Sequence, residues 1–291
     1  MRLLDLLMNS IKGFLIGVAE VIPGVSGGTI ALVVGIYERV LAQAALVAKA
    51  FTDLFRSPAT SVKSLRRLDL KLLLPVGIGM LTAILAGAAV LEPLIAEQPE
   101  ITLALFAGLI AASLVVPFRM VGSWRPSLFV IAAAAAALAF VLTSLPKSSI
   151  SSPELWFVFL SAAVAICALV LPGVSGSFFL FAVGLYQSTI AAVNDRDFAY
   201  LGVFALGAIV GLFSFALFMQ YLLINFRAIT LAAMTGLMLG SLRALWPWQS
   251  DTAELLAPIS PGGPILAFGV GFLMVTGLII WQGRLKAGSA Q

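Results

Sequence analysis

Two short clusters in this sequence have residue types and a spacing that could bind a ligand. Each follows a Pro-Gly-Val step and combines hydroxyl side chains with glycine. The members are Ser26, Gly27, Gly28 and Thr29 in the first half, and Ser175, Gly176 and Ser177 in the second. A Pro-Gly pair stops a helix, and Ser-Gly starts the next one with unpaired backbone N–H groups. Glycine lets a ligand approach those groups closely, so both clusters predict an anion site of the kind that binds phosphate. Tight packing of helix on helix is the alternative use of the same glycines.

Both clusters belong to a longer internal match. The sequence Pro-Gly-Val-Ser-Gly begins at Pro23 and again at Pro172, 149 positions later, and a Gly-x-Tyr step follows each copy at the same distance. A second match aligns residues 101–114 with residues 229–242, and eight of the fourteen positions are identical. Two matches in the same order indicate a duplicated chain.

Three charged residues could act together with these clusters. Glu20 lies three residues before Pro23 within an apolar run. An ionised carboxylate is costly at that depth, so Glu20 is a candidate proton carrier, and capping of backbone amides is its structural alternative. Arg119 and Arg243 follow the two matched runs, and a guanidinium suits phosphate. Reaching toward lipid headgroups is the other expected role of both arginines.

Composition limits what the chain can be. Of 291 residues, 61% are hydrophobic and 10% are charged, which predicts an all-α membrane protein with several spans. The chain has no histidine and one cysteine, so a His-ligated metal site, a Ser-His-Asp triad and a disulfide framework are excluded. We expect no cofactor, no metal and no nucleic-acid partner.

The charges between the apolar runs predict the topology. Residues 49–71 contain six Lys or Arg and two Asp, whereas residues 92–100 contain three Glu and no base. Basic loops stay on the cytoplasmic side of the cell membrane. We therefore expect a cytoplasmic basic loop at residues 49–71 and both chain termini in the cytoplasm.

The same count leaves residues 13–37 with both ends inside and residues 155–193 with both ends outside. We interpret each as a re-entrant hairpin with Pro-Gly-Val-Ser-Gly at its tip, although residues 155–193 are nearly long enough for two full spans. One membrane domain, residues 1–291, then holds two repeats, residues 11–145 and 155–286. Each repeat is a hairpin plus about three spans, inserted in opposite directions. Such an inverted-topology repeat places a substrate site near the midplane.

The residues around both clusters resemble a known family, the polyprenyl-phosphate transporters of bacteria and archaea. The likeness covers residues 19–29 with 35–38 and residues 172–177 with 184–186, and extends over essentially the whole chain. It implies a translocase that returns undecaprenyl phosphate from the outer to the inner leaflet after cell-wall polymer assembly. The implied partners are this lipid and the surrounding membrane lipids, and a homo-oligomer is left open. Glu20 and the seven residues of the two clusters would form the family's phosphate site.

Two rival functions stay open. The residues from Gly17 to Ser26 also resemble undecaprenyl-diphosphate phosphatases, but Thr29 and Gly176 stand where those enzymes have His and Arg. Without groups for acid–base catalysis or charge neutralisation, catalysis is disfavoured. A transporter or channel for a small inorganic anion could use the same helix ends. A closed vestibule would favour that anion, and a cleft open sideways to lipid would favour a lipid.

Overall fold

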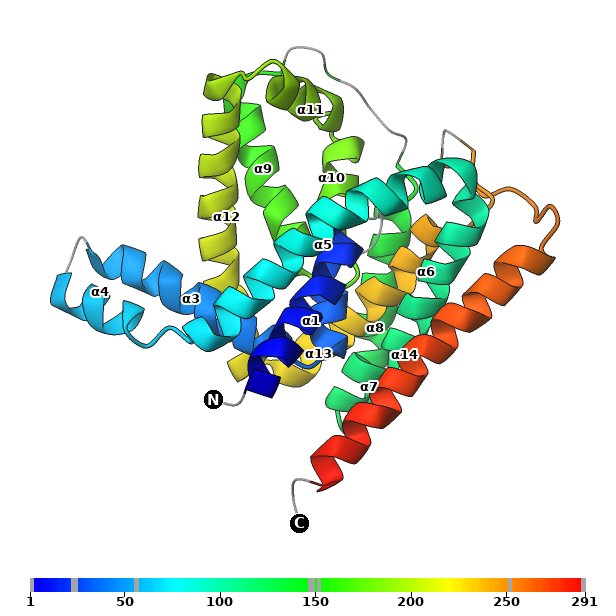
Figure 1. The fold of residues 1–291 in the computed structure, drawn as a ribbon, viewed down its shortest axis with the longest axis horizontal. Coiled ribbons are helices and arrows are strands. Elements are labelled where there is room, and N and C mark those ends of the chain that lie inside the picture. Colours follow the sequence, from blue (N-terminus) through cyan, green and yellow to red (C-terminus); the bar gives the residue numbers. More distant parts are fainter. Residues whose placement is uncertain are drawn as a thin grey trace.

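The computed structural model describes residues 3–21, 26–54, 58–145, 150, 153–250 and 253–288. These residues form fourteen α-helices and one short 3-10 helix (Figure 1). The helices of the first half are α1 (Leu3–Val21), α2 (Gly27–Val33), α3 (Tyr37–Leu54), α4 (Pro58–Leu65), α5 (Leu70–Glu97), α6 (Pro99–Ser113), α7 (Val115–Met120) and α8 (Pro126–Leu142). The second half has α9 (Leu155–Val170), α10 (Gly176–Ala182), α11 (Tyr186–Asn194), α12 (Phe198–Asn225), α13 (Arg227–Ser241), η1 (Leu242–Leu245) and α14 (Gly262–Gly288).

The all-helical membrane fold predicted from composition is confirmed. Four described segments are long and apolar enough to cross a membrane: Pro99–Met120, Phe198–Asn225, Arg227–Leu245 and Gly262–Trp281. Shorter apolar helices cover Leu70–Ala86, Pro126–Leu142 and Leu155–Val170. Backbone polar groups have no water to bind in a bilayer, so helices are the form in which these runs satisfy their own hydrogen bonds.

The second Pro-Gly cluster lies at the turn between α9 and α10, and in the first half Ser26 directly precedes α2. In Figure 1, α9 descends from the top of the molecule and α10 returns toward α11, whereas α1 rises from the N-terminus in the lower half and α3 extends to the left. The tip of the first hairpin was predicted at residues 23–27, and residues 22–25 lie outside the described part of the chain. That each hairpin is re-entrant in a membrane stays a prediction.

The two hairpins share their backbone geometry. Ser26 and Ser175 start the seven-residue helices α2 and α10 with nearly the same angles, φ −110°, ψ 124° and φ −105°, ψ 128°. Gly35 and Gly184 end them with φ of 74° and 81°. This left-handed conformation favours glycine, which explains the repeated Gly-x-Tyr step. After that turn, α10 and α11 meet at 105°.

The long helices pack in four pairs. Within the halves, α1 packs along α5 and α9 along α12; between the halves, α6 packs along α14 and α13 along α8. Each half thus packs one of its helices against a helix of the other half in a corresponding way, as a two-fold relation between the halves would require. The inverted repeat itself stays a prediction. Close contact in these pairs depends on small residues: a Cβ at Gly236 would lie 2.0 Å from the Ala132 carbonyl oxygen, and one at Gly207 would lie 2.2 Å from that of Phe159.

The structure adds detail to two of the predicted segments. The first arm of the first hairpin, predicted from residue 13, is part of a longer helix, because α1 runs without a break from Leu3. The described parts of residues 49–71 are largely helical, since α3 continues to Leu54 and α4 packs back on it, and the cytoplasmic placement of this segment stays a prediction. The Ser61 hydroxyl donates to the Ala50 carbonyl at 2.7 Å and fixes this return.

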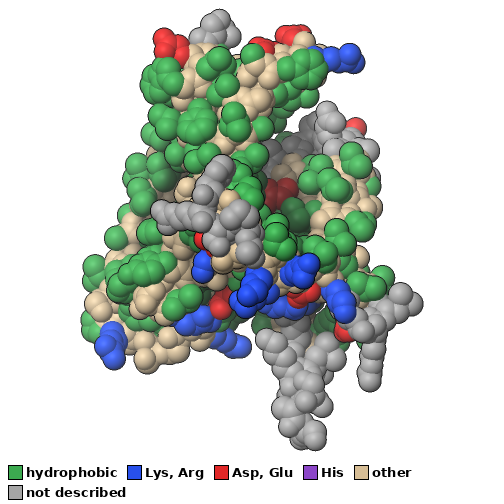
Figure 2. Space-filling model, turned by 90° about the vertical axis from the view of Figure 1, so that its left-hand side faces the viewer, with side chains coloured by type: hydrophobic (Ala, Val, Ile, Leu, Met, Phe, Trp, Pro, Cys, Tyr) green, Lys and Arg blue, Asp and Glu red, His purple; other side chains and the backbone are tan. Residues whose placement is uncertain are grey.

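Many Lys and Arg side chains lie toward one end of the molecule, which we call the basic end. It includes Arg119 on α7 and Arg227 at the start of α13, at the bottom of Figure 1, and Arg39 and Lys63 on α3 and α4, at its left. Figure 2 shows Lys and Arg side chains gathered across the lower part of one face, with a hollow above them that contains an acidic side chain.

Candidate functional site

The two hairpin tips are joined by hydrogen bonds. The Ser26 hydroxyl donates to the carbonyl oxygen of Leu171 at 3.0 Å, with the Leu169 carbonyl at 3.4 Å. In the reverse direction, the Gly173 N–H donates to the Thr29 hydroxyl at 2.9 Å. Ser26 and Thr29 are 2% and 0% exposed, so both hydroxyls are buried in the contact between the two hairpins. Ser26 and Thr29 therefore close the first tip onto the second in this conformation.

Glu20 binds the start of α2. Its Oε1 atom accepts a hydrogen bond from the Gly27 N–H at 3.1 Å, across the turn of its own hairpin. A charged acceptor at a helix N-terminus satisfies an otherwise unpaired donor and contributes about 1.5–3 kcal/mol. The capping role proposed for Glu20 from sequence is thus present, but within one hairpin and not between the two. Leu169 is its counterpart in the second half and offers no such group.

The second tip keeps more of its donors available. The hydroxyls of Ser175 and Ser177 are 2.9 Å apart, and Ser175 also accepts from the Phe178 N–H at 3.4 Å. In the described part of the chain, no hydrogen bond is recorded from the N–H of Gly176 or Ser177. The structure therefore brings two hydroxyls and two amide donors together at the start of α10.

Two of the predicted site glycines are required for packing. A Cβ at Gly28 would lie 2.6 Å from the Val170 carbonyl oxygen, and one at Gly176 would lie 2.6 Å from that of Ala165. Neither contact leaves room for a side chain. The close-packing alternative considered from sequence therefore applies to both glycines, Gly28 between the hairpins and Gly176 within one.

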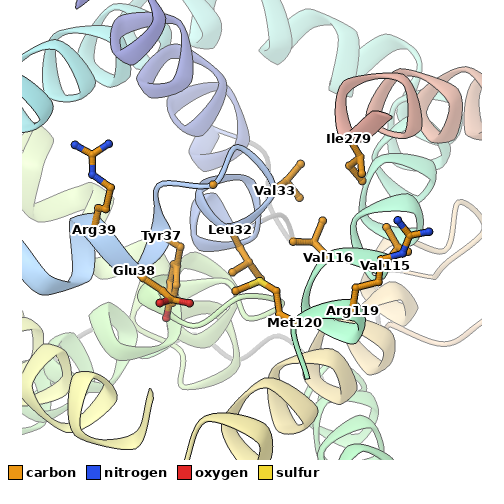
Figure 3. Close-up of a pocket in the computed structure, with 11 residues that line it drawn as sticks. Leu32, Val33, Tyr37, Glu38, Arg39, Val115, Val116, Arg119, Met120 and Ile279 are labelled. Carbon is orange, nitrogen blue, oxygen red and sulfur yellow. The ribbon is translucent and has the colours of Figure 1, made fainter. Parts of the chain in front are cut away.

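A large cavity of about 530 Å³ opens at the basic end (Figure 3). Arg119 on α7 and Met120 stand on one wall, and Tyr37, Glu38 and Arg39 stand on the opposite wall. Leu32 and Val33 of α2 lie between these walls, so the cavity reaches from the basic end toward the first hairpin.

Most charges around this cavity are paired. Arg227 binds Glu38 through two hydrogen bonds of 2.7 and 3.1 Å, and Arg39 contacts Asp69 at 3.0 Å. Arg119 has no ion-pair or hydrogen-bond partner among the described residues, and its side chain is exposed. With the other charges neutralised, Arg119 makes the cavity attractive to an anion.

A smaller cavity of about 150 Å³ lies beside Glu20. Gly27 and Gly28 of the first tip line it, and the rest of its lining is mostly apolar. Tyr37 lines both this cavity and the large one, so it separates the basic end from the carboxylate.

Tyr37 is a residue to which sequence reasoning gave no role. Its hydroxyl is buried and has no hydrogen-bond partner among the described residues, and the residue is 5% exposed. A buried polar atom without a partner is rare and costly, which makes this position stand out. The only sequence signal was the repeated Gly-x-Tyr step.

A further cavity between the halves is small. It has a volume of about 30 Å³ and is lined by Gly173, Val174 and Ser175 of the second tip, together with residues of α8 and α13. Among the described residues, the hairpin contact thus has a cavity of about 530 Å³ toward the basic end and one of about 30 Å³ beside the second tip.

Arg243 is held by backbone carbonyls of neighbouring elements, and its role in binding phosphate stays a prediction. It donates to the carbonyl oxygens of Thr143 and Ala253, and it lies 5.2 Å from the centre of the Phe140 ring. These contacts tie η1 to α8 and to the following loop. The described residues contain no group of His, Cys, Asp or Glu that could hold a metal ion.

Comparison with known proteins identifies the family of the chain. Residues 16–259 match a family described as undecaprenyl phosphate translocase-like. A polyprenyl-phosphate transporter of Vibrio cholerae is 33% identical over 248 residues, covering 85% of this chain and 80% of that protein. A polyprenyl-phosphate transporter of Staphylococcus aureus is 28% identical over 259 residues, covering 82% and 86%. No solved structure matches.

Proposed function

Since the chain belongs to the undecaprenyl phosphate translocase-like family, we propose that it moves a polyprenyl phosphate between the two leaflets of the cell membrane. Its two named relatives are polyprenyl-phosphate transporters, and it shares most of its length with both. The direction we propose is from the outer to the inner leaflet, which returns the carrier for another round of cell-wall polymer synthesis.

The observation that carries the proposal is the unequal space that the described residues leave on the two sides of the hairpin contact. A cavity of about 530 Å³ lies on the side of Arg119, and one of about 30 Å³ lies on the side of Ser175. We infer that the structure represents a state open to the basic end, with the joined tips as the barrier. By the positive-inside rule, the basic end faces the cytoplasm.

The tips offer what a lipid phosphate needs in order to cross. An isolated charge in hydrocarbon costs tens of kcal/mol by Born solvation. Hydroxyls and N–H groups of Ser175, Gly176 and Ser177 would replace part of the lost water, and Arg119 would meet the phosphate at the basic end. When the Ser26 and Thr29 bonds open, their hydroxyls become available to the same phosphate. Rocking of one half against the other then exposes the phosphate to each leaflet in turn.

A lipid fits better than a small inorganic anion because the space beside the basic cavity is apolar. A cavity of about 420 Å³ adjoins it and is lined only by hydrophobic side chains. An inorganic anion makes no favourable contact with such a surface, whereas the hydrocarbon chain of a lipid does.

The test compares three substrates on the purified protein in proteoliposomes. We expect exchange of a labelled polyprenyl phosphate between leaflets, no uptake of labelled inorganic phosphate, and no phosphate release from polyprenyl diphosphate. Uptake of inorganic phosphate without lipid exchange would replace the proposal by a small-anion transporter. Phosphate release would replace it by an enzyme.

A further inference from the structure

The apolar cavity next to the basic one has walls from four helices. They are α1, α2, α6 and α14, and the cavity has a volume of about 420 Å³. All its lining residues are hydrophobic, and they include Leu15, Val33, Phe106, Leu109 and Met274. A dry apolar space of this size has no favourable water structure and is suited to hydrocarbon.

The cavity lies where two helix pairs separate. α1 packs along α5, and α14 packs along α6, so α1 and α14 face each other across the cavity without forming a packed pair of their own. Met274 is 62% exposed and Leu15 is 38% exposed, although both line the cavity. Their exposure indicates that the cavity opens sideways between these helices, toward the lipid that surrounds a membrane protein.

The apolar cavity and the basic cavity adjoin each other. Val33 of α2 lines both, and the neighbouring residues Leu278 and Ile279 of α14 line one each. An amphipathic molecule can therefore place an anionic head near Arg119 while its chain lies between α1 and α14. The combined space matches the two chemical parts of a lipid phosphate.

We propose that the apolar cavity receives the isoprene units nearest the phosphate and that the chain enters through the gap between α1 and α14. The inference rests on the proposed function and adds the position of the chain. A prenyl chain in the bilayer is already surrounded by hydrocarbon, so the cavity gains little affinity from burial. Its effect is to give the chain a continuous path, which lets the head advance toward the hairpin tips.

Two neighbouring residues of α14 provide a matched test. Met274 lines the cavity, whereas Leu273 is 69% exposed and does not. Both positions accept a bulky side chain without disturbing the protein core. We expect Met274→Trp to lower the rate of polyprenyl phosphate exchange in proteoliposomes at least about tenfold by blocking the gap, and Leu273→Trp to stay within about twofold of wild type.

Leu109→Trp fills the same cavity from α6 and serves as a second variant in case Met274→Trp does not fold. Thermal unfolding in detergent identifies such a case. If a folded variant at position 109 or 274 exchanges lipid as fast as Leu273→Trp, the chain does not use this cavity and the inference is overturned. If wild-type protein exchanges no lipid at all, the proposed function fails instead, so the two failures are distinguishable.

Discussion

Replacing Glu20 with alanine is expected to reduce polyprenyl phosphate exchange at least about tenfold and to lower the free energy of unfolding by about 1–3 kcal/mol. The carboxylate of Glu20 accepts the hydrogen bond of the Gly27 N–H, and alanine leaves that donor without a partner at the start of α2. Because Gly27 adjoins Ser26 and Gly28, the loss also affects the contact between the hairpins. Exchange in proteoliposomes and thermal unfolding in detergent measure the two effects.

Glu20→Gln distinguishes the effect of the Glu20 charge on transport from the effect of its hydrogen bond to Gly27. Its side-chain oxygen still accepts from Gly27, but it can no longer take up a proton. If Glu20 couples transport to a proton gradient, exchange by wild type depends on pH and exchange by Glu20→Gln does not. Full transport by Glu20→Gln with the pH dependence of wild type would rule the coupling out. Glu97→Ala is the control, because this exposed acid at the end of α5 lies away from both tips.

Gly173→Ala should be among the most destabilising substitutions in the chain. Gly173 has φ 88°, and a Cβ there would lie 2.5 Å from the Met238 backbone nitrogen. The left-handed conformation costs a non-glycine residue about 1–2 kcal/mol, and forcing apart a tight contact adds about 1–3 kcal/mol. We expect the free energy of unfolding to fall by about 2–5 kcal/mol in total. We also expect no measurable lipid exchange, because a shift of the backbone at position 173 would disturb the hydrogen bond from its N–H to the Thr29 hydroxyl.

Gly35→Ala is the matched control for this prediction. Gly35 has φ 74°, but nothing lies within 4 Å of a Cβ placed there. Alanine at position 35 therefore has the cost of the left-handed conformation but meets no steric clash. We expect the free energy of unfolding to fall by only about 1–2 kcal/mol. Equal losses at positions 35 and 173, measured by thermal unfolding, would show that the contact with Met238 does not hold the second tip in place.

The local structure of the hairpins could be predicted because it depends on residue types. The Pro-Gly pair ends a helix and Ser starts the next one, whereas the Gly-x-Tyr step was noted only as a repeated sequence, and the left-handed glycine in it is a finding of the structure. Gly35 and Gly184 adopt that conformation in both halves. The apolar runs likewise have to form helices in a bilayer, whatever their neighbours are.

The partners of the site residues could not be predicted from their types. Ser26 and Thr29 bind backbone groups of the other hairpin, and any residue could supply a backbone carbonyl or N–H. The carbonyls to which Arg243 donates could not be predicted either, and phosphate binding by Arg243 stays a prediction. The missing partner of the Tyr37 hydroxyl is a property of packing and appears only in three dimensions.

The measurement that tests the account most directly is leaflet exchange of a labelled polyprenyl phosphate by wild type and by Ser26→Ala/Ser175→Ala. Both hydroxyls lie at the hairpin tips, and Ser113→Ala is the control, because the Ser113 hydroxyl binds only the Leu109 carbonyl of its own helix. The account predicts rapid exchange by wild type and by Ser113→Ala, and a loss of at least about tenfold in the folded double variant. Unchanged exchange by the folded double variant would contradict passage of the phosphate at the hairpin tips.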